Sequence, residues 1–380
     1  MDPNGLDFDL DTIIAGMRPW IECESPTHDA AAVDRCMDIA ARDLALMGAT
    51  IERIPGRMGF GGCVRARLAH RQAGAGRDGP GILVMGHLDT VHPIGTLRVL
   101  PFRREGGRCW GPGIMDMKGG NYIALEALRG LARAGVTTNL PVTVLLTPDE
   151  EVGSPSSRDL IEAEAARHRY VLVPEPARPD GGVVTGRYAI ARFRLEAEGK
   201  PSHAGARLAD GRSAISEMAR QILAIEAMTT ADATFSVGVL RGGEWVNCVA
   251  TTCTAQALTM AKRQADLDRA VAAMEALGPI GQGVGFRAVR TVVRPVWEPD
   301  QATLALWERA SRIAQGLGFA IPPQSAGGGS DANFTGAMGI ASLDGLGLGG
   351  DGVHTLDEHI DEATVLGRTR LLAGLLAALD

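Results

Sequence analysis

The sequence contains no block of basic residues and no long apolar run. Its 38 lysines and arginines are fewer than its 45 aspartates and glutamates, so the formal net charge is −7. Binding to the phosphate backbone of nucleic acid needs a basic surface, and this balance argues against such a partner. No apolar stretch approaches the length of a membrane span. Residues 1–7 are acidic and lack the apolar core of a signal peptide, so we expect neither a membrane association nor a leader.

The cysteines show no Cys-x-x-Cys spacing, which would indicate a metal or redox site. Six cysteines without such a pair favour reduced thiols and a cytoplasmic location. Internal repeats and low-complexity tracts are also lacking. One formal Gly-x-Gly-x-x-Gly match occurs at residues 74–79, but it precedes a strand pattern instead of opening a helix. We therefore interpret it as a surface turn and not as a dinucleotide loop.

The length of 380 residues is too great for one ordinary hydrophobic core, so we expect two domains. A hydrophobic content of 45% and a charged content of 22% are typical of globular proteins. Strand patterns at 62–68, 81–85, 142–146 and 170–173 alternate with helical patterns at 8–18, 30–47 and 121–134. This alternation predicts an α/β fold with a mixed, mostly parallel sheet and helices on both faces.

The pattern changes near residue 185. Strand patterns at 189–198, 235–240 and 248–260, with helical patterns at 213–228 and 266–277, predict a smaller βαββαβ-like module inserted in the larger domain. We assign residues 185–295 to this inserted α+β domain. The larger domain is then discontinuous and comprises residues 1–184 and 296–380.

Side chains that bind metals follow several of the predicted strands. The apolar run at 81–85 leads into His87 and Asp89, which share one face of an extended segment. Later segments add further ligands of this kind, namely Asp116, the pair Glu150–Glu151, Glu175 and His354. In open α/β sheets, residues just beyond the strand ends form the site. One His-x-Asp alone is weak evidence, but five such segments together predict a metal centre.

Two imidazoles and three carboxylates are too many for a tetrahedral single-metal site that leaves room for water. They suit two divalent ions that share a bridging carboxylate, polarise a carbonyl and lower the pKa of bound water. We expect zinc, with cobalt or manganese as alternatives. In the Glu150–Glu151 pair, one carboxylate would bind metal and the other would act as general base. Each piece taken singly also has an ordinary explanation: a Glu-Glu pair is usually solvated, His203 would be a turn residue, and Asp331 a helix N-cap.

Six segments resemble the M20 metallopeptidase family, in order and with similar spacing along nearly the whole chain. They include Gly-His-Leu-Asp-Thr-Val, Met-Asp-Met-Lys-Gly-Gly, Pro-Asp-Glu-Glu-Val-Gly-Ser and Gly-Gly-Gly-Ser-Asp. The full set lies at 86–91, 111–120, 148–154, 174–176, 200–205 and 327–331. Within the family, the segments most resemble the glutamate carboxypeptidase (carboxypeptidase G2) branch. Aminoacylases and the acetylornithine and succinyl-diaminopimelate deacylases are related branches.

The resemblance implies a role for each matching metal ligand. Asp116 would bridge the two ions. His87 and Glu175 would complete one metal site, and Glu151 and His354 would complete the other.

The resemblance also implies roles outside the ligand set. Glu150 would be the general base, and Asp89 would orient His87. His203, in the smaller domain, would reach the active site of the partner subunit and stabilise the oxyanion. The smaller domain would thus be the dimerisation lid of a homodimer. The residues expected near the substrate are Asn247, Arg187, Arg294, Gly328 and Gly329.

The sequence departs from the family pattern at three positions. Met260 stands where the glutamate carboxypeptidase branch carries an arginine for the substrate carboxylate. Glycine near Gly182 replaces a lysine, and Met117 replaces an aspartate without affecting the ligand. Arg187 and Arg294 are the candidate carboxylate partners that are left.

We therefore predict a metal-dependent amidohydrolase of the carboxypeptidase or aminoacylase type, acting on an N-acyl or N-aroyl amino acid or a small peptide-like conjugate. Hydrolysis of a non-peptide C–N bond at the same site is the alternative. An aminopeptidase is less favoured, because the family would then carry aspartate where Glu175 stands. A non-catalytic binding protein on this fold would have no need of Glu150.

Overall fold

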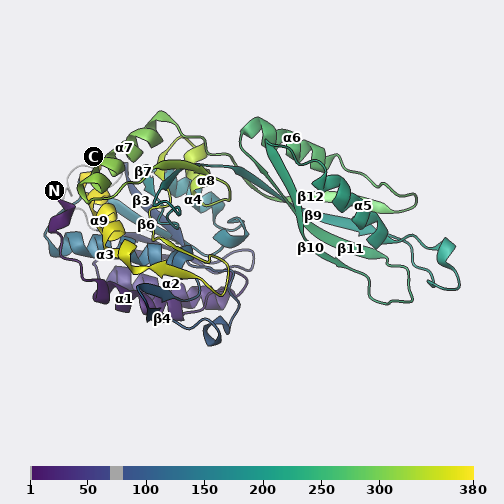
Figure 1. The fold of residues 1–380 in the computed structure, drawn as a ribbon, viewed down its shortest axis with the longest axis horizontal. Coiled ribbons are helices and arrows are strands. Elements are labelled where there is room, and N and C mark those ends of the chain that lie inside the picture. The colour runs from purple at the N-terminus through teal and green to yellow at the C-terminus, as the bar shows by residue number, and fades with distance from the viewer. Residues whose placement is uncertain (1, 69–79) are drawn as a thin grey trace. The chain divides into compact units, whose positions relative to one another are not determined.

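The computed structural model describes residues 2–68 and 80–380 (Figure 1). The Gly-x-Gly-x-x-Gly match at 74–79 lies outside the described residues. The chain divides into two compact units. Unit 1 comprises Met1–Gly186, Glu298–Ser325 and Ser330–Asp380, and unit 2 comprises Arg187–Trp297 and Ala326–Gly329. Within residues 2–68 and 80–380, none of the helices combines the length and the apolar character that crossing a membrane requires.

Unit 1 is built around a six-stranded sheet with the order β1-β2-β6-β3-β7-β14. Its strands are β1 (Thr50–Ile54), β2 (Cys63–Arg67), β3 (Gly81–His87), β6 (Val142–Thr147), β7 (His168–Leu172) and β14 (Ala341–Leu343). β6, β3, β7 and β14 pair in parallel. β2 is antiparallel to both β6 and β1, so it alone runs against the others. The predicted mixed, mostly parallel sheet is confirmed.

Both faces of this sheet are covered, as its apolar strands require. Every residue of β3 and β6 is buried. Val84 and Val144 join the large core on one face, whereas their neighbours Leu83 and Leu145 point to the other face. The first face is covered by α1 (Leu10–Glu22), α2 (Ala30–Ala45), α3 (Gly119–Arg133), α7 (Gln301–Gly316) and α9 (Glu362–Ala378). The second is covered by α4 (Arg158–Ala165) and α8 (Ala332–Ala337), which lie apart from α1–α3 in Figure 1.

Helix α1 differs from the expected range of 8–18, because it starts at Leu10 and continues through Pro19 to Glu22. Proline in a helix removes a backbone hydrogen bond. Trp20 and Ile21 are nevertheless fully buried in the core, and burial of large apolar side chains stabilises a fold by about 1.5–3 kcal/mol each. The gain from these two residues outweighs the lost bond and carries the helix past the proline.

Short strands complete unit 1. A four-stranded sheet has the order β15-β16-β5-β4, formed by β15 (Gly350–Asp351), β16 (His359–Asp361), β5 (Arg108–Trp110) and β4 (Arg103–Glu105). β8 (Val183–Arg187) pairs with β13 (Pro323–Ala326). These strands have two to five residues, too few to produce a clear period in the sequence.

Unit 2 is a four-stranded antiparallel sheet with the order β10-β11-β9-β12. In chain order its elements are β9 (Ala189–Glu198), α5 (Ala214–Glu226), β10 (Ala233–Gly242), β11 (Thr252–Ala261), α6 (Gln264–Glu275) and β12 (Gly285–Arg294), which is the βαββαβ order expected. Phe193 and Leu195 face the core under the two helices, whereas Arg194 and Glu196 between and beside them are not buried. This alternation gives the sheet one apolar and one polar face.

Candidate metal centre

Three neighbouring parallel strands carry three of the five predicted ligands, and Glu150, at their carboxyl ends. His87 is the last residue of β3. Glu150 and Glu151 open the 3₁₀ turn η4 (Glu150–Val152) that follows β6, and Glu175 follows β7. The strands are adjacent in the order β6-β3-β7. Their ends therefore meet at one edge of the sheet, the position at which open α/β sheets place their sites.

The carboxylate of Asp116 lies between two imidazoles. Its Oδ1 is 3.2 Å from Nε2 of His87, and its Oδ2 is 3.2 Å from Nε2 of His354. Each imidazole has a second carboxylate beside it. Nε2 of His87 is 3.8 Å from Oε1 of Glu175, and Nε2 of His354 is 3.1 Å from Oε2 of Glu151. The structure thus brings all five predicted metal ligands together.

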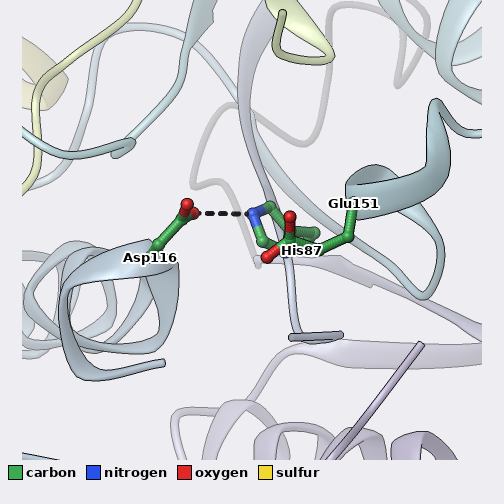
Figure 2. A group of neighbouring side chains, drawn as sticks. All are labelled: His87, Asp116 and Glu151. Carbon is green, nitrogen blue, oxygen red and sulfur yellow. Dashed lines mark hydrogen bonds and ion pairs between the residues drawn. The ribbon is translucent and has the colours of Figure 1, made fainter. Parts of the chain in front are cut away.

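The donor set fits divalent metal ions. One ligand atom each of His87, Asp116 and Glu151 lies within 4.8 Å of the others, and Figure 2 shows Asp116 and Glu151 on either side of the His87 imidazole in that view. Imidazole nitrogen and carboxylate oxygen are the usual ligands of zinc and related ions. Closely spaced carboxylates repel one another unless cations lie between them. The arrangement therefore calls for positive charge at its centre.

For each of these groups, burial and ion pairing have opposite effects on the pKa. Burial acts against the charge on His87, but hydrogen bonds to Asp116 and Asp89 outweigh it and leave the pKa of His87 well above its usual range. Hydrogen bonds to Asp116 and Glu151 raise the pKa of His354 to about 10. Burial raises the pKa of Glu151 and of Glu175. A metal ion needs neutral imidazoles and ionised carboxylates as ligands, so its binding would displace protons from this site.

The predicted ligand Asp116 lies in an irregular turn. It belongs to η3 (Ile114–Lys118), directly before α3, and its φ of −115° and ψ of 96° are not helical. The turn starts after Gly113, which has a left-handed φ of 71°. His354 is also left-handed, with a φ of 65° that is unusual for a residue other than glycine. Such backbone conformations persist where the surrounding structure fixes them, often at functional sites.

Glu150 lies beside the ligand group. Its Oε2 is 4.0 Å from Nε2 of His87. The backbone N–H groups of Glu150 and Glu151 donate to the two carboxylate oxygens of Asp89, at 3.1 and 3.3 Å. Asp89 also lies 3.3 Å from Nδ1 of His87, and it accepts a hydrogen bond from the Thr27 hydroxyl at 2.7 Å. Asp89 therefore connects the end of β3 with the turn after β6.

Asp331 supports the same turn from a second direction. It stands at the N-cap position of α8, but its side chain makes no capping hydrogen bond. Its carboxylate instead accepts from the hydroxyl groups of Thr147, at 3.1 Å, and Ser154. These two residues flank η4 on both sides. The expected N-cap position of Asp331 is confirmed, whereas its side chain holds the turn that carries Glu150.

Two further residues next to the site were missed by sequence reasoning. Glu358 is fully buried and accepts hydrogen bonds from backbone N–H groups of the Asp116 turn. His92 lies with its Nε2 2.6 Å from Oε2 of Glu358. The signal in the sequence is slight: Glu358 is four residues beyond His354, and His92 is five beyond His87.

In unit 2, His203 and Asn247 lie in neighbouring loops. The backbone N–H of Ala204 donates to the carbonyl oxygen of Asn247 at 2.9 Å. Nδ1 of His203 accepts from the backbone N–H groups of Gly205 and Ala206, both at 3.1 Å. Because Nδ1 is an acceptor, the imidazole proton is on Nε2. The side chain is exposed, so His203 presents an N–H donor to its surroundings.

The remaining predicted residues gather at the other end of β9. Nη1 of Arg187 lies 3.4 Å from the carbonyl oxygen of Gly328 and 3.3 Å from that of Gly329. Arg294 is buried, and a Cβ on Gly329 would lie only 2.6 Å from its Cδ. A side chain at position 329 would therefore require Arg294 to shift. Met260, on β11, is half-buried.

The pattern of peptidase family M20/M25/M40 matches residues 83–378 of the chain. Carboxypeptidase G2 of Pseudomonas sp. (strain RS-16) is 29% identical over 374 residues, which cover 96% of this chain and 88% of that protein. Succinyl-diaminopimelate desuccinylase of Gluconacetobacter diazotrophicus is 28% identical over 343 residues, covering 83% of this chain and 85% of the relative. The crystal structure of aminopeptidase PepT from Bacillus cereus superposes with a TM-score of 0.74 at 20% identity, covering 97% of this chain and 98% of the other. At that identity, the structural likeness shows a shared fold.

Proposed function

Because the chain belongs to peptidase family M20/M25/M40, we propose that it is a di-metal hydrolase of an N-acyl or N-aroyl amino acid, or of a small peptide-like conjugate. Hydrolysis of a peptide or amide bond follows from the family and from the carboxypeptidase and desuccinylase relatives. One observation carries the metal assignment: the Asp116 carboxylate lies between two imidazoles, each with a second carboxylate beside it.

In this proposal Asp116 would bind both of two divalent ions. His87 and Glu175 would complete one metal site, and Glu151 and His354 the other, the pairing that their distances favour. When bound, such an ion pair polarises a substrate carbonyl and lowers the pKa of a water molecule. Zinc is our first choice, and cobalt or manganese would accept the same ligands.

Glu150 is the general base. It would take a proton from the attacking water and deliver it to the departing amine, the two proton transfers that amide hydrolysis needs. Oε2 of Glu150 is 4.0 Å from Nε2 of His87, whereas the nearest oxygen of Asp116 is 3.2 Å from the same nitrogen. Glu150 thus lies beside the proposed ligands without being the carboxylate nearest to His87, and this position supports its role as the base. Asp89 would keep Glu150 in place through the backbone bond at 3.1 Å.

We assign His203 to the stabilisation of the oxyanion in the partner subunit. The exposed Nε2–H is a suitable donor for a developing negative charge. The chain enters unit 2 at Arg187, and the ten residues of β9 separate this point from the His203 loop. A strand of that length spans roughly 30 Å. The His203 loop therefore lies at the end of β9 that is far from the point where the chain enters unit 2.

A homodimer formed through unit 2 would provide that second subunit. β10 is an edge strand of its sheet, so within the described residues one side of its backbone has no neighbouring strand. Exposed apolar side chains lie on β10 and on α5, which packs beside it, namely Val239, Leu240 and Leu223. Pairing of two such edges about a two-fold axis would cover them. The cytoplasmic location stays a prediction from the composition.

A panel of amides tests the proposed substrate class. Zinc-loaded enzyme would be given N-benzoyl and N-acetyl derivatives of glutamate, leucine and phenylalanine, the same compounds with the α-carboxylate amidated, dipeptides with a free amine, and a ureido acid. We expect cleavage of the N-acylated amino acids with a free α-carboxylate. A requirement for a free α-amine would favour an aminopeptidase, and cleavage of the ureido acid alone would favour the non-peptide alternative.

A further inference from the structure

Glu358 is a buried carboxylate that touches the turn of the bridging ligand. It directly precedes β16, whose first residue, His359, pairs with Trp110 of β5. This register places Glu358 against the start of the turn that follows β5. Its Oε2 accepts the backbone N–H of Gly113 at 2.9 Å, and its Oε1 accepts those of Met115 at 2.9 Å and Asp116 at 3.1 Å.

The same carboxylate has a fourth donor. Nε2 of the buried His92 lies 2.6 Å from Oε2 of Glu358. A buried charge is costly unless it is paired and hydrogen-bonded. The carboxylate of Glu358 is hydrogen-bonded by three backbone N–H groups of the turn before α3 and by the imidazole of His92 from the loop after β3.

The backbone of the Asp116 turn depends on such an acceptor. Gly113, Met115 and Asp116 lie at the start of the η3 segment, where backbone N–H groups have no acceptor within the segment itself. Buried N–H groups without acceptors cost free energy comparable to a lost hydrogen bond. Glu358 supplies the acceptor, and it thereby fixes the orientation in which the Asp116 side chain leaves the backbone.

We propose that Glu358, held by His92, is a positioning residue that sets the bridging carboxylate of Asp116 for metal binding. The short segment from His354 to Glu358 would then contact both the side chain and the backbone of Asp116. His354 lies 3.2 Å from its carboxylate, and Glu358 accepts its backbone N–H. This inference rests on the proposed metal-binding role of Asp116.

The first test compares Glu358→Gln with a matched control, Glu164→Gln. Glutamine keeps the size of the side chain but replaces one acceptor oxygen by an NH₂ donor. Either the N–H groups of Met115 and Asp116, or those of Gly113 and His92, then lose their acceptor. Glu164 is also buried in unit 1, where its Oε2 lies 2.6 Å from Nη1 of Arg65. Both variants should lower the melting temperature of the metal-free protein. Only Glu358→Gln should weaken zinc binding, measured by competition with a chelator, by about 10- to 100-fold, as removal of partners behind metal ligands does.

A second pair of variants tests His92 and keeps the inference testable if Glu358→Gln does not fold. Glutamine at 92 retains an N–H donor, whereas leucine does not. His92→Gln should keep nearly the zinc affinity of the wild type, and His92→Leu should lose affinity about tenfold.

Asp116→Asn separates this inference from the proposed function. If Asp116→Asn binds zinc as tightly as the wild type, the metal assignment itself fails. If Asp116→Asn loses zinc while a folded Glu358→Gln and His92→Leu keep wild-type affinity, the positioning role is overturned. An equal loss of zinc affinity in Glu164→Gln would overturn it too, because the effect would then be one of general stability.

Discussion

The carboxylate of Asp89 accepts the backbone N–H of Glu150 at 3.1 Å, and this bond joins the end of β3 to the turn after β6. Asp89 was expected to orient His87, but Nδ1 of His87 also lies 2.9 Å from the backbone oxygen of Asp89. The backbone can thus fix the imidazole tautomer without the side chain. The Asp89 carboxylate, which also lies 3.3 Å from Nδ1 of His87, is placed to hold the turn that carries the proposed general base.

Replacement of Asp89 by asparagine separates these two roles. The amide side chain would offer one acceptor oxygen in place of two, so the Glu150 turn would lose part of its support. For Asp89→Asn we expect kcat to fall by about 10- to 100-fold, with a smaller change in zinc affinity. Steady-state kinetics and chelator competition measure the two quantities. Loss of zinc with a preserved kcat in the fully loaded enzyme would assign the side chain to His87 instead.

Replacement of Glu150 by glutamine removes the base and keeps the size of the side chain. We expect kcat to fall at least about 100-fold, the usual scale for general acid–base catalysis. The metal content should not change, because Glu151 and not Glu150 is the proposed ligand. Glu151→Gln is the matched variant, and elemental analysis of both proteins would detect an exchange of roles. Loss of metal from Glu150→Gln but not from Glu151→Gln would show that exchange.

The meeting of several candidate ligands at one edge of the sheet could be predicted from the sequence, because these residues follow a local signal. His87 ends a buried apolar strand, Glu151 and Glu175 follow two others, and parallel neighbours bring such ends to one edge. The family resemblance carried by the six segments is confirmed by the match over residues 83–378. The βαββαβ order of unit 2 could also be predicted from local patterns. Ten-residue strands such as β9 and β11 show a clear alternation of buried and exposed residues.

The support behind the ligands could not be predicted in this way. Glu358 reaches the Asp116 turn only through the pairing of β16 with β5, and each of these strands has three residues. Three residues are too few to reveal a period of two. The bond from His92 to Glu358 likewise joins residues 266 positions apart. Such contacts depend on topology, which local patterns do not encode.

Mixing two inactive variants tests the action of His203 across subunits. His203→Gln would lack the oxyanion donor, and Glu150→Gln would lack the base. In a mixed dimer, one site would combine Glu150 of one chain with His203 of the other. Co-refolding equal amounts should therefore restore about a quarter of the wild-type activity for random pairing in a two-fold dimer. Activity that stays at the level of the separate variants, with mixed dimers verified, would argue against action across subunits.

The side chain at Met260 leads to a prediction about specificity. A substrate glutamate needs a cation, and arginine supplies one with two parallel hydrogen bonds. Methionine offers a flexible apolar contact instead, and Trp245, two residues before Asn247, is exposed. We expect a higher kcat/KM for aromatic or apolar N-acyl amino acids than for aroyl-glutamate, and Met260→Arg should shift the ratio toward glutamate by about tenfold. A wild-type preference for glutamate would show that Arg187 or Arg294 performs this role.

The most direct test of the central claim is a titration of the verified metal-free protein with zinc, while the hydrolysis of an N-acyl amino acid is followed. Cobalt and manganese would be titrated in parallel. The proposed site predicts no hydrolysis without metal and a rise to a plateau at about two ions per chain, since the five ligands are assigned to a two-metal centre. Full activity in the metal-free protein, or a plateau at about one ion per chain, would contradict it.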